Sequence, residues 1–150
     1  MDNNTKEKIL HEISYLNNFI NTSKPLLNFC KINEPNFTEI TALAMILHAF
    51  YNGVESIFLL ILKSRNEIVP SDGHWHKGLF DIMFGKNSMK TAFIREDLKN
   101  MLRQYLDFRH FIRHSYSTIL VWGEMKNLVE NLEETWTMIK SDFERMMEEN

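Results

Sequence analysis

The sequence contains little cysteine, proline or glycine. Its 150 residues include one cysteine, three prolines and five glycines. The single cysteine, Cys30, cannot form a disulfide within the chain, so we expect a reducing compartment. Because few residues favour tight turns, long helices with short connections suit this chain better than many short strands. Hydrophobic residues make up 44% and charged residues 25%, which excludes a disordered chain and allows one domain over residues 1–150.

The sequence also has little that would hold it in a membrane. Residues 1–8 are polar and lack the apolar centre of a signal peptide. The most apolar stretch, residues 57–62, is much shorter than the roughly 20 residues that a membrane-spanning helix needs. The net charge of −3 weakly repels nucleic acid, so any nucleic-acid function requires a local basic patch. We therefore expect a soluble, cytoplasmic protein.

The apolar residues recur at helical spacing throughout the chain. The first predicted helix ends or kinks at Pro25, and the second begins near Asn36 or Thr38, either of which can cap it. A loop at residues 69–73 precedes a short third helix at about 75–83. The fourth helix is predicted from about 91 to 113, and the fifth from about 122 to the C-terminus. The predicted fold is all-α, a single-domain antiparallel bundle of four to five helices.

Each predicted helix has a stripe of apolar residues that we expect to be buried. The stripe of the second helix is the longest. The expected core residues are Ile9, Ile13, Leu16 and Ile20; Ile40, Leu43, Leu47, Phe50, Val54, Ile57 and Ile61; Ile94, Leu98, Met101, Tyr105, Phe108 and Ile112; and Leu128, Leu132, Trp136, Ile139 and Phe143.

Basic residues follow a second sector of the fourth predicted helix, about a third of a turn from its apolar face. They are Arg95, Lys99, Arg103, Arg109, His110 and Arg113. A phosphate backbone could lie along such a stripe. Alternatively, the stripe is a solvated face that pairs with acidic residues of the last helix. Those residues are Glu130, Glu133, Glu134, Asp142 and Glu144.

The stripe leads into residues 109–116, the segment richest in chemically capable side chains. Arg109 offers a charged planar fork that suits a phosphate. Histidine side chains in general titrate near neutral pH, so a residue such as His114 can exchange a proton with a ribose 2′-hydroxyl or a leaving oxygen. The pair could therefore cleave RNA, and not DNA, without a metal. On an ideal helix the two lie about 140° apart. If the helix ends near Arg113, His114 and Tyr116 can turn to the arginine side.

The spacing Arg109, four residues, His114, one residue, Tyr116 resembles the R-x4-H-x-Y signature of HepT-like toxins in the HEPN superfamily. His110 occupies the polar position that often follows the arginine. Residues 51–55 and 74–77 and a last helix from Trp122 agree in order with this branch. The resemblance extends from about residue 38 to residue 132.

The resemblance implies a dimeric HEPN bundle in which two Arg109/His114 motifs form one RNA-cleaving cleft. The implied partner is a minimal nucleotidyltransferase antitoxin that attaches AMP to Tyr116 and so silences the toxin. Within that framework we expect Arg109 to hold the scissile phosphate and His114 to act as general acid or base. His110 and Arg113 would assist substrate binding. We expect the remaining basic residues of the stripe to guide the strand, and these are Arg95, Lys99 and Arg103.

Other interpretations of these residues remain open. The chain could be a non-catalytic HEPN module that binds a nucleotidyltransferase or a nucleotide. A metal site made of four histidines is disfavoured because neither cysteine nor a zinc-protease glutamate supports it, and no cofactor is expected. Those histidines are His74, His76, His110 and His114. His76 more readily caps, packs or lines the cleft edge. Glu55 either pairs with Arg109 or a neighbouring helix, or faces solvent.

Overall fold

The computed structural model describes residues 1–114 and 120–149, and these residues form an all-helical bundle. Six α-helices and one short 3₁₀ helix make up the described part. The α-helices are α1 (Asn3–Ile32), α2 (Phe37–Ser64), α3 (Trp75–Met83), α4 (Lys99–His114), α5 (Trp122–Glu130) and α6 (Leu132–Glu148), and the 3₁₀ helix η1 is Glu96–Leu98. The predicted all-α class, the third helix and the loop before it are confirmed.

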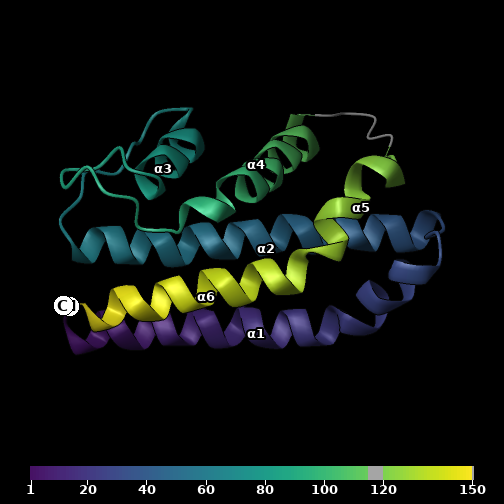
Figure 1. Ribbon diagram of the computed structural model, residues 1–150, viewed down its shortest axis with the longest axis horizontal. Coiled ribbons are helices and arrows are strands. Elements are labelled where there is room, and N and C mark those ends of the chain that lie inside the picture. Colours follow the sequence, from purple (N-terminus) through teal and green to yellow (C-terminus); the bar gives the residue numbers. More distant parts are fainter. Residues whose placement is uncertain (115–119, 150) are drawn as a thin grey trace.

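Helix α2 runs through the middle of the molecule (Figure 1). Helices α1 and α6 lie side by side on one side of it, and α3 and α4 lie on the other. The whole predicted stripe of α2 is buried, and so are further residues on its other faces. A helix that is apolar nearly all round has to be surrounded by protein, which explains this central position.

By length and composition α2 could also cross a membrane. The sequence-based prediction considered only residues 57–62 and did not identify this longer candidate. More than half of its most apolar window is buried inside the protein, as is usual for the core helix of a soluble bundle. Asn36 caps the helix, because its side chain accepts a hydrogen bond from the Glu39 backbone while the Glu39 carboxylate accepts one from Asn36.

Helix α1 does not end at Pro25 but continues to Ile32. Proline removes one backbone hydrogen bond from a helix, and here the freed carbonyl belongs to Asn21. Both Asn21 and Pro25 are exposed, so water can satisfy that carbonyl. Beyond the proline, Leu27 and Cys30 are buried and hold the last turns against the bundle.

The fourth helix begins later than the predicted residue 91. The backbone N–H groups of Phe93 and Ile94 donate to the Met83 carbonyl, at 2.8 and 3.2 Å, so this segment is bound to the end of α3. Helical structure starts only with η1. The predicted fifth helix is divided at Asn131, whose side-chain amide donates to the Asn127 carbonyl and ends α5 there.

The buried face of α4 is also rotated from the predicted one. Met101, Phe108 and Ile112 are only half-buried. The buried residues of the helix are Leu102, Tyr105, Leu106 and Arg109. This face packs on α2 and carries an arginine inward, and that arginine belongs to the motif singled out from the sequence.

The contact between α1 and α2 depends on a glycine. A Cβ atom at Gly53 would lie 2.7–2.9 Å from three side-chain atoms of the buried Leu16. We expect Gly53→Val to lower the free energy of unfolding by about 2–3 kcal/mol, because the core must shift to admit it. Urea unfolding measures the loss. Gly123→Val is the control, since nothing lies within 4 Å of that Cβ position. Equal stability of the two variants would contradict this account of the helix contact.

Candidate functional site

A cleft of about 850 Å³ lies between α4 and the segment that leads into α3. Residues 71–77 form one wall and α4 forms the other. The lining residues are Ser71, Asp72, Gly73, His74, Trp75, His76, Lys77, Arg103, Leu106, Asp107, Arg109, His110, Arg113 and His114. Four of them are lysine or arginine and two are aspartate, so the cleft carries a positive charge suited to an anion.

Arg109 is the most deeply held of these cations, at 7% exposure. Its Nε donates to Oδ1 of Asn52 at 2.9 Å and lies 3.6 Å from Oε1 of Glu55. Glu55 is 3% exposed and projects from the middle of α2. A buried guanidinium requires such a counter-charge. Because α2 holds Nε, the terminal NH1 and NH2 groups are the part of Arg109 available to a ligand in the cleft.

Glu55 also binds the opposite wall of the cleft. Nδ1 of His76 lies 2.9 and 3.0 Å from the two carboxylate oxygens. Burial raises the pKa of Glu55 to about 7, and the charge of Arg109 opposes that rise. Burial, together with the charges of Arg109 and Arg113, lowers the pKa of His76 to about 4. The imidazole is therefore neutral at physiological pH, while the carboxyl titrates close to it.

Helix α4 continues through His114, one residue beyond the predicted end, and brings its motif residues to the cleft. The rings of His110 and His114 contact each other at a tilt, with centroids 4.3 Å apart, because residues four apart share a helix face. Both rings are exposed. Arg109 and His114 thus line the same cleft without the predicted turn of the chain. Tyr116 and that turn lie outside the described residues.

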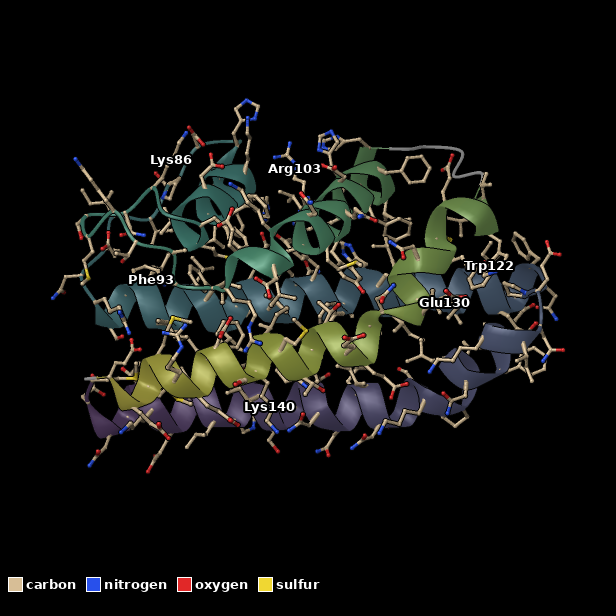
Figure 2. The ribbon with its side chains drawn as sticks, in the orientation of Figure 1. Lys86, Phe93, Arg103, Trp122, Glu130 and Lys140 are labelled. Atoms are coloured by element: carbon tan, nitrogen blue, oxygen red, sulfur yellow. The ribbon has the colours of Figure 1, made fainter. Side chains whose placement is uncertain are left out.

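The predicted basic stripe is divided among different partners. Figure 2 labels Arg103, whose guanidinium lies over the Phe80 ring of α3 and pairs with Asp107 at the cleft. Lys99 pairs with Glu96 and is not among the cleft residues. Arg95 lies before η1 and binds Asp142 of α6 through its backbone and its side chain.

The structure therefore separates Arg95 and Lys99 from the other basic residues of the stripe. The contact of Arg95 with Asp142 is the pairing with the last helix that the sequence offered as an alternative. Sequence reasoning found Glu55 and His76 but did not join them, and it missed His48. The side chain of His48 contacts Asn52 at 3.1 Å, one turn earlier on α2. The signal was a run of polar residues at helical spacing in an otherwise apolar helix, namely His48, Asn52 and Glu55.

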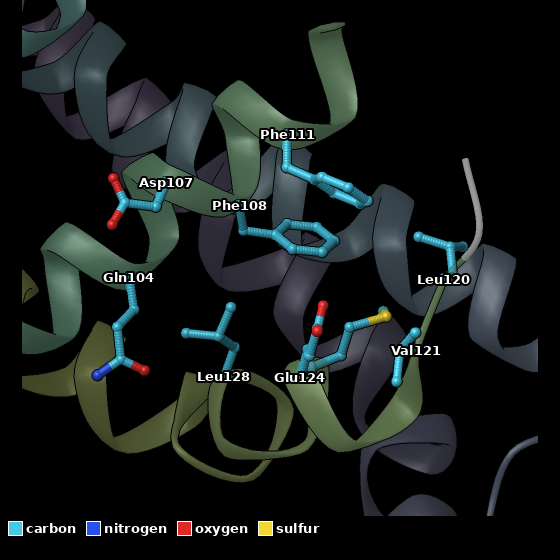
Figure 3. A pocket seen from close by; sticks show the side chains of 9 residues that line it. Gln104, Asp107, Phe108, Phe111, Leu120, Val121, Glu124 and Leu128 are labelled. Atoms are coloured by element: carbon cyan, nitrogen blue, oxygen red, sulfur yellow. The ribbon is translucent and has the colours of Figure 1, made fainter. Parts of the chain in front are cut away.

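A second cavity of about 300 Å³ lies between α4 and α5 (Figure 3). Phe108, Phe111 and Leu120 supply much of its apolar lining, and its charged residues are Asp107 and Glu124. Because both charges are negative, this pocket does not suit a phosphate. Among the described residues, no three histidine, cysteine, aspartate or glutamate side chains are arranged to hold a metal ion.

The fold and the cleft together define a class, an all-helical bundle with an arginine- and histidine-lined cleft for an anion. The family model described as HepT-like protein matches residues 42–150, from early in α2 onward. The chain therefore belongs to the HepT-like family of the HEPN superfamily. Membership of this family suggests a HEPN-type toxin of toxin–antitoxin systems. Members of the HepT-like family are generally HEPN ribonucleases. Comparison with curated proteins and with solved structures gave no match.

The raised pKa of Glu55 predicts a pH-dependent stability. The folded protein retains the proton of this carboxyl more strongly than the unfolded chain, where the ordinary value is 4.5. The stabilisation is therefore complete below pH 4.5 and is lost as the pH rises through about 7. The side chain of Glu55→Gln cannot ionise. As the pH rises from 4.5 to 8, we expect the free energy of unfolding of this variant to increase by up to about 3 kcal/mol relative to that of the wild type.

Urea unfolding across this pH range measures the effect. The matched control is Glu144→Gln, since Glu144 is exposed on α6. The free energy of unfolding of Glu144→Gln should equal that of the wild type at every pH. A constant difference between Glu55→Gln and the wild type over the whole range would contradict the assignment of a buried, titrating carboxyl.

Proposed function

We propose that this protein is the toxin of a HEPN/MNT toxin–antitoxin pair, a cytoplasmic endoribonuclease that needs no metal. The observation that carries the proposal is the cleft in which Arg109, anchored from α2, shares a wall with His110, Arg113 and His114. This set can bind a phosphodiester and exchange protons with it. Family membership supports the same class of protein.

Arg109 would hold the scissile phosphate through its terminal nitrogens. Its Nε is fixed by Asn52, so the guanidinium enters the cleft with little freedom left to lose on binding. Arg113 has no ion-pair partner within residues 1–114 and 120–149, so its charge is available to the substrate. His110 would assist binding beside it, and Arg103 would guide the strand along the rim. Lys99 and Arg95 would contribute only to the wider positive field.

His114 would transfer a proton during attack of the ribose 2′-hydroxyl on phosphorus. It is exposed at the end of α4, so a substrate can reach its ring. We further propose that the protein acts as a homodimer, with two copies of the Arg109/His114 motif meeting in one composite site. The exposed position of His114 at the end of α4 is compatible with such an arrangement.

Control of the toxin would act through Tyr116. A minimal nucleotidyltransferase antitoxin would attach AMP to this hydroxyl, two residues after His114. The added phosphodiester carries a negative charge that would compete with RNA for the arginines of the cleft.

The His114→Ala variant tests the catalytic proposal. We expect it to lose at least about 100-fold in the rate of RNA cleavage while keeping its helical content and oligomeric state. Cleavage is measured on total RNA with EDTA present throughout, and the wild type should remain active there. The control is His11→Ala, because His11 is exposed on α1, on the far side of α2 from the cleft. Undiminished cleavage by His114→Ala would refute the role of His114, and a wild type inactive with and without EDTA would favour the non-catalytic module.

Modification of Tyr116 tests the proposed control. Incubation with a minimal nucleotidyltransferase of the antitoxin class, ATP and Mg²⁺ should raise the intact mass by whole AMP units and abolish cleavage. Tyr116→Phe should gain no mass on that residue and remain active in the presence of the transferase. Tyr15→Phe is the control, since Tyr15 is exposed on α1. AMP found on another residue would refute the assignment.

A further inference from the structure

We propose that His76 is the general base of the RNA cleavage, held in place by Glu55, and that His114 on the other wall of the cleft is the general acid. The inference rests on the proposed function, because it divides the proton transfers of that reaction between two residues. It adds α3 to a site that the motif alone would confine to α4.

The contact between His76 and Glu55 orients the imidazole. Both carboxylate oxygens lie within 3.0 Å of Nδ1, so this nitrogen is bound to the buried carboxylate of Glu55. The other nitrogen, Nε2, lies on the opposite side of the ring, and His76 lines the cleft. The Trp75 ring packs against the imidazole with centroids 3.5 Å apart and limits its rotation. A carboxylate bound to one nitrogen leaves the other as the proton acceptor.

The charges around the dyad keep the imidazole neutral. The groups that act on His76 are Glu55 of α2 and Arg109 and Arg113 of α4, and Tyr51 of α2 also interacts with Glu55. Burial, and then the two cations, lower the pKa of His76, so it does not take up a proton before the substrate arrives. When Glu55 is ionised, it accepts the Nδ1 hydrogen, and Nε2 is free to accept another. A general base needs this state.

Within residues 1–114 and 120–149, the other histidines of the cleft have no such carboxylate partner. His74 is exposed, and its side chain has no carboxylate partner in the described part of the chain. His110 and His114 contact each other at the solvent-facing end of α4. Of the four histidines, His76 is the one that the structure joins to a buried carboxylate, which is also the carboxylate that holds Arg109. The base and the phosphate-binding group are therefore positioned by one side chain.

The proposed step balances as an internal transfer. Nε2 of His76 takes the proton of the ribose 2′-hydroxyl, and the 2′-oxygen forms a bond to phosphorus. The bond from phosphorus to the 5′-oxygen breaks, and protonated His114 gives its proton to that oxygen. The products are a 2′,3′-cyclic phosphate and a 5′-hydroxyl. No oxidant, reductant or water is consumed, and Arg109 stabilises the charge on the phosphoryl oxygens.

A sulfur-substituted substrate separates the base from the acid. The probe is an RNA oligonucleotide that contains a cleavage site mapped with the wild type, made with either oxygen or sulfur at the 5′-bridging position. A thiolate leaves without a proton, so only the oxygen substrate needs the acid. We expect His114→Ala to lose at least about 100-fold on the oxygen substrate and less than about tenfold on the sulfur substrate. His76→Gln should lose at least about 100-fold on both.

The control is His11→Gln, which should cleave both substrates as the wild type does. Wild-type speed in His76→Gln, or recovery of that variant on the sulfur substrate, would overturn the assignment of His76 as base. Failure of the sulfur substrate to restore His114→Ala would overturn the assignment of His114 as acid. A wild type that cuts neither substrate would refute the proposed nuclease itself, so that failure is distinct from the others.

The pH profile gives a second test that does not require His76 to be replaced. On the sulfur substrate, wild-type kcat/KM should rise with pH through about 7, as Glu55 ionises and frees Nε2. In Glu55→Gln this acidic limb should move down by more than one pH unit, because the amide cannot ionise and the low pKa of His76 then governs it. A limb that stays in place in Glu55→Gln would overturn the dyad, even if His76→Gln does not fold.

Discussion

The contact between Glu55 and Arg109 organises this protein, because it joins the core helix α2 to the helix that carries the motif. Both side chains are buried, and each charge lowers the cost of burying the other when Glu55 is ionised. Asn52 adds a direct hydrogen bond to the same guanidinium nitrogen. Together these contacts set the rotation of α4 on α2. His110, Arg113 and His114 follow on the next turn and so line the cleft.

The core and the site thus share one helix. The apolar stripe of α2 is covered by α1, α5 and α6, while His48, Asn52 and Glu55 lie on the side that meets α4. A side chain that projects from the middle of a packed helix has little conformational freedom. Such a side chain is well suited to positioning other residues of a site. Glu55 binds α4 through Arg109 and α3 through His76, so three helices meet at a single carboxylate.

The sequence predicted the parts of the fold that depend on local patterns. The buried stripes of the first two helices, the cap at Asn36 and the short third helix all follow from apolar spacing and capping chemistry. The late start of α4 could not be predicted, because it depends on a carbonyl of α3 that accepts the Phe93 and Ile94 amides. The continuation of α1 through Pro25 depends on solvent exposure and on the burial of Leu27 and Cys30.

The motif spacing proposed Arg109 and His114 as site residues, and the structure places both at one cleft. The sequence counted Arg109 with the surface cations and did not predict its burial. Yet Arg109 lies four residues after Tyr105 and three after Leu106, which are both buried, and this spacing already assigns it to the inner face. Arg95 and Lys99 were assigned to the basic stripe only from their angular positions around the predicted helix. Their partners, Asp142 and Glu96, could be identified only from the arrangement of the helices and the turn before α4.

The layered arrangement has a practical consequence for handling the molecule. Helix α1 begins, and α6 ends, at the same edge of the bundle, in the layer across α2 from α3 and α4 (Figure 1). A solid support, a fluorophore or a carrier protein attached at either point would sit behind the central helix. The cationic cleft would still face open solution, so long polyanions could reach it while the protein is tethered.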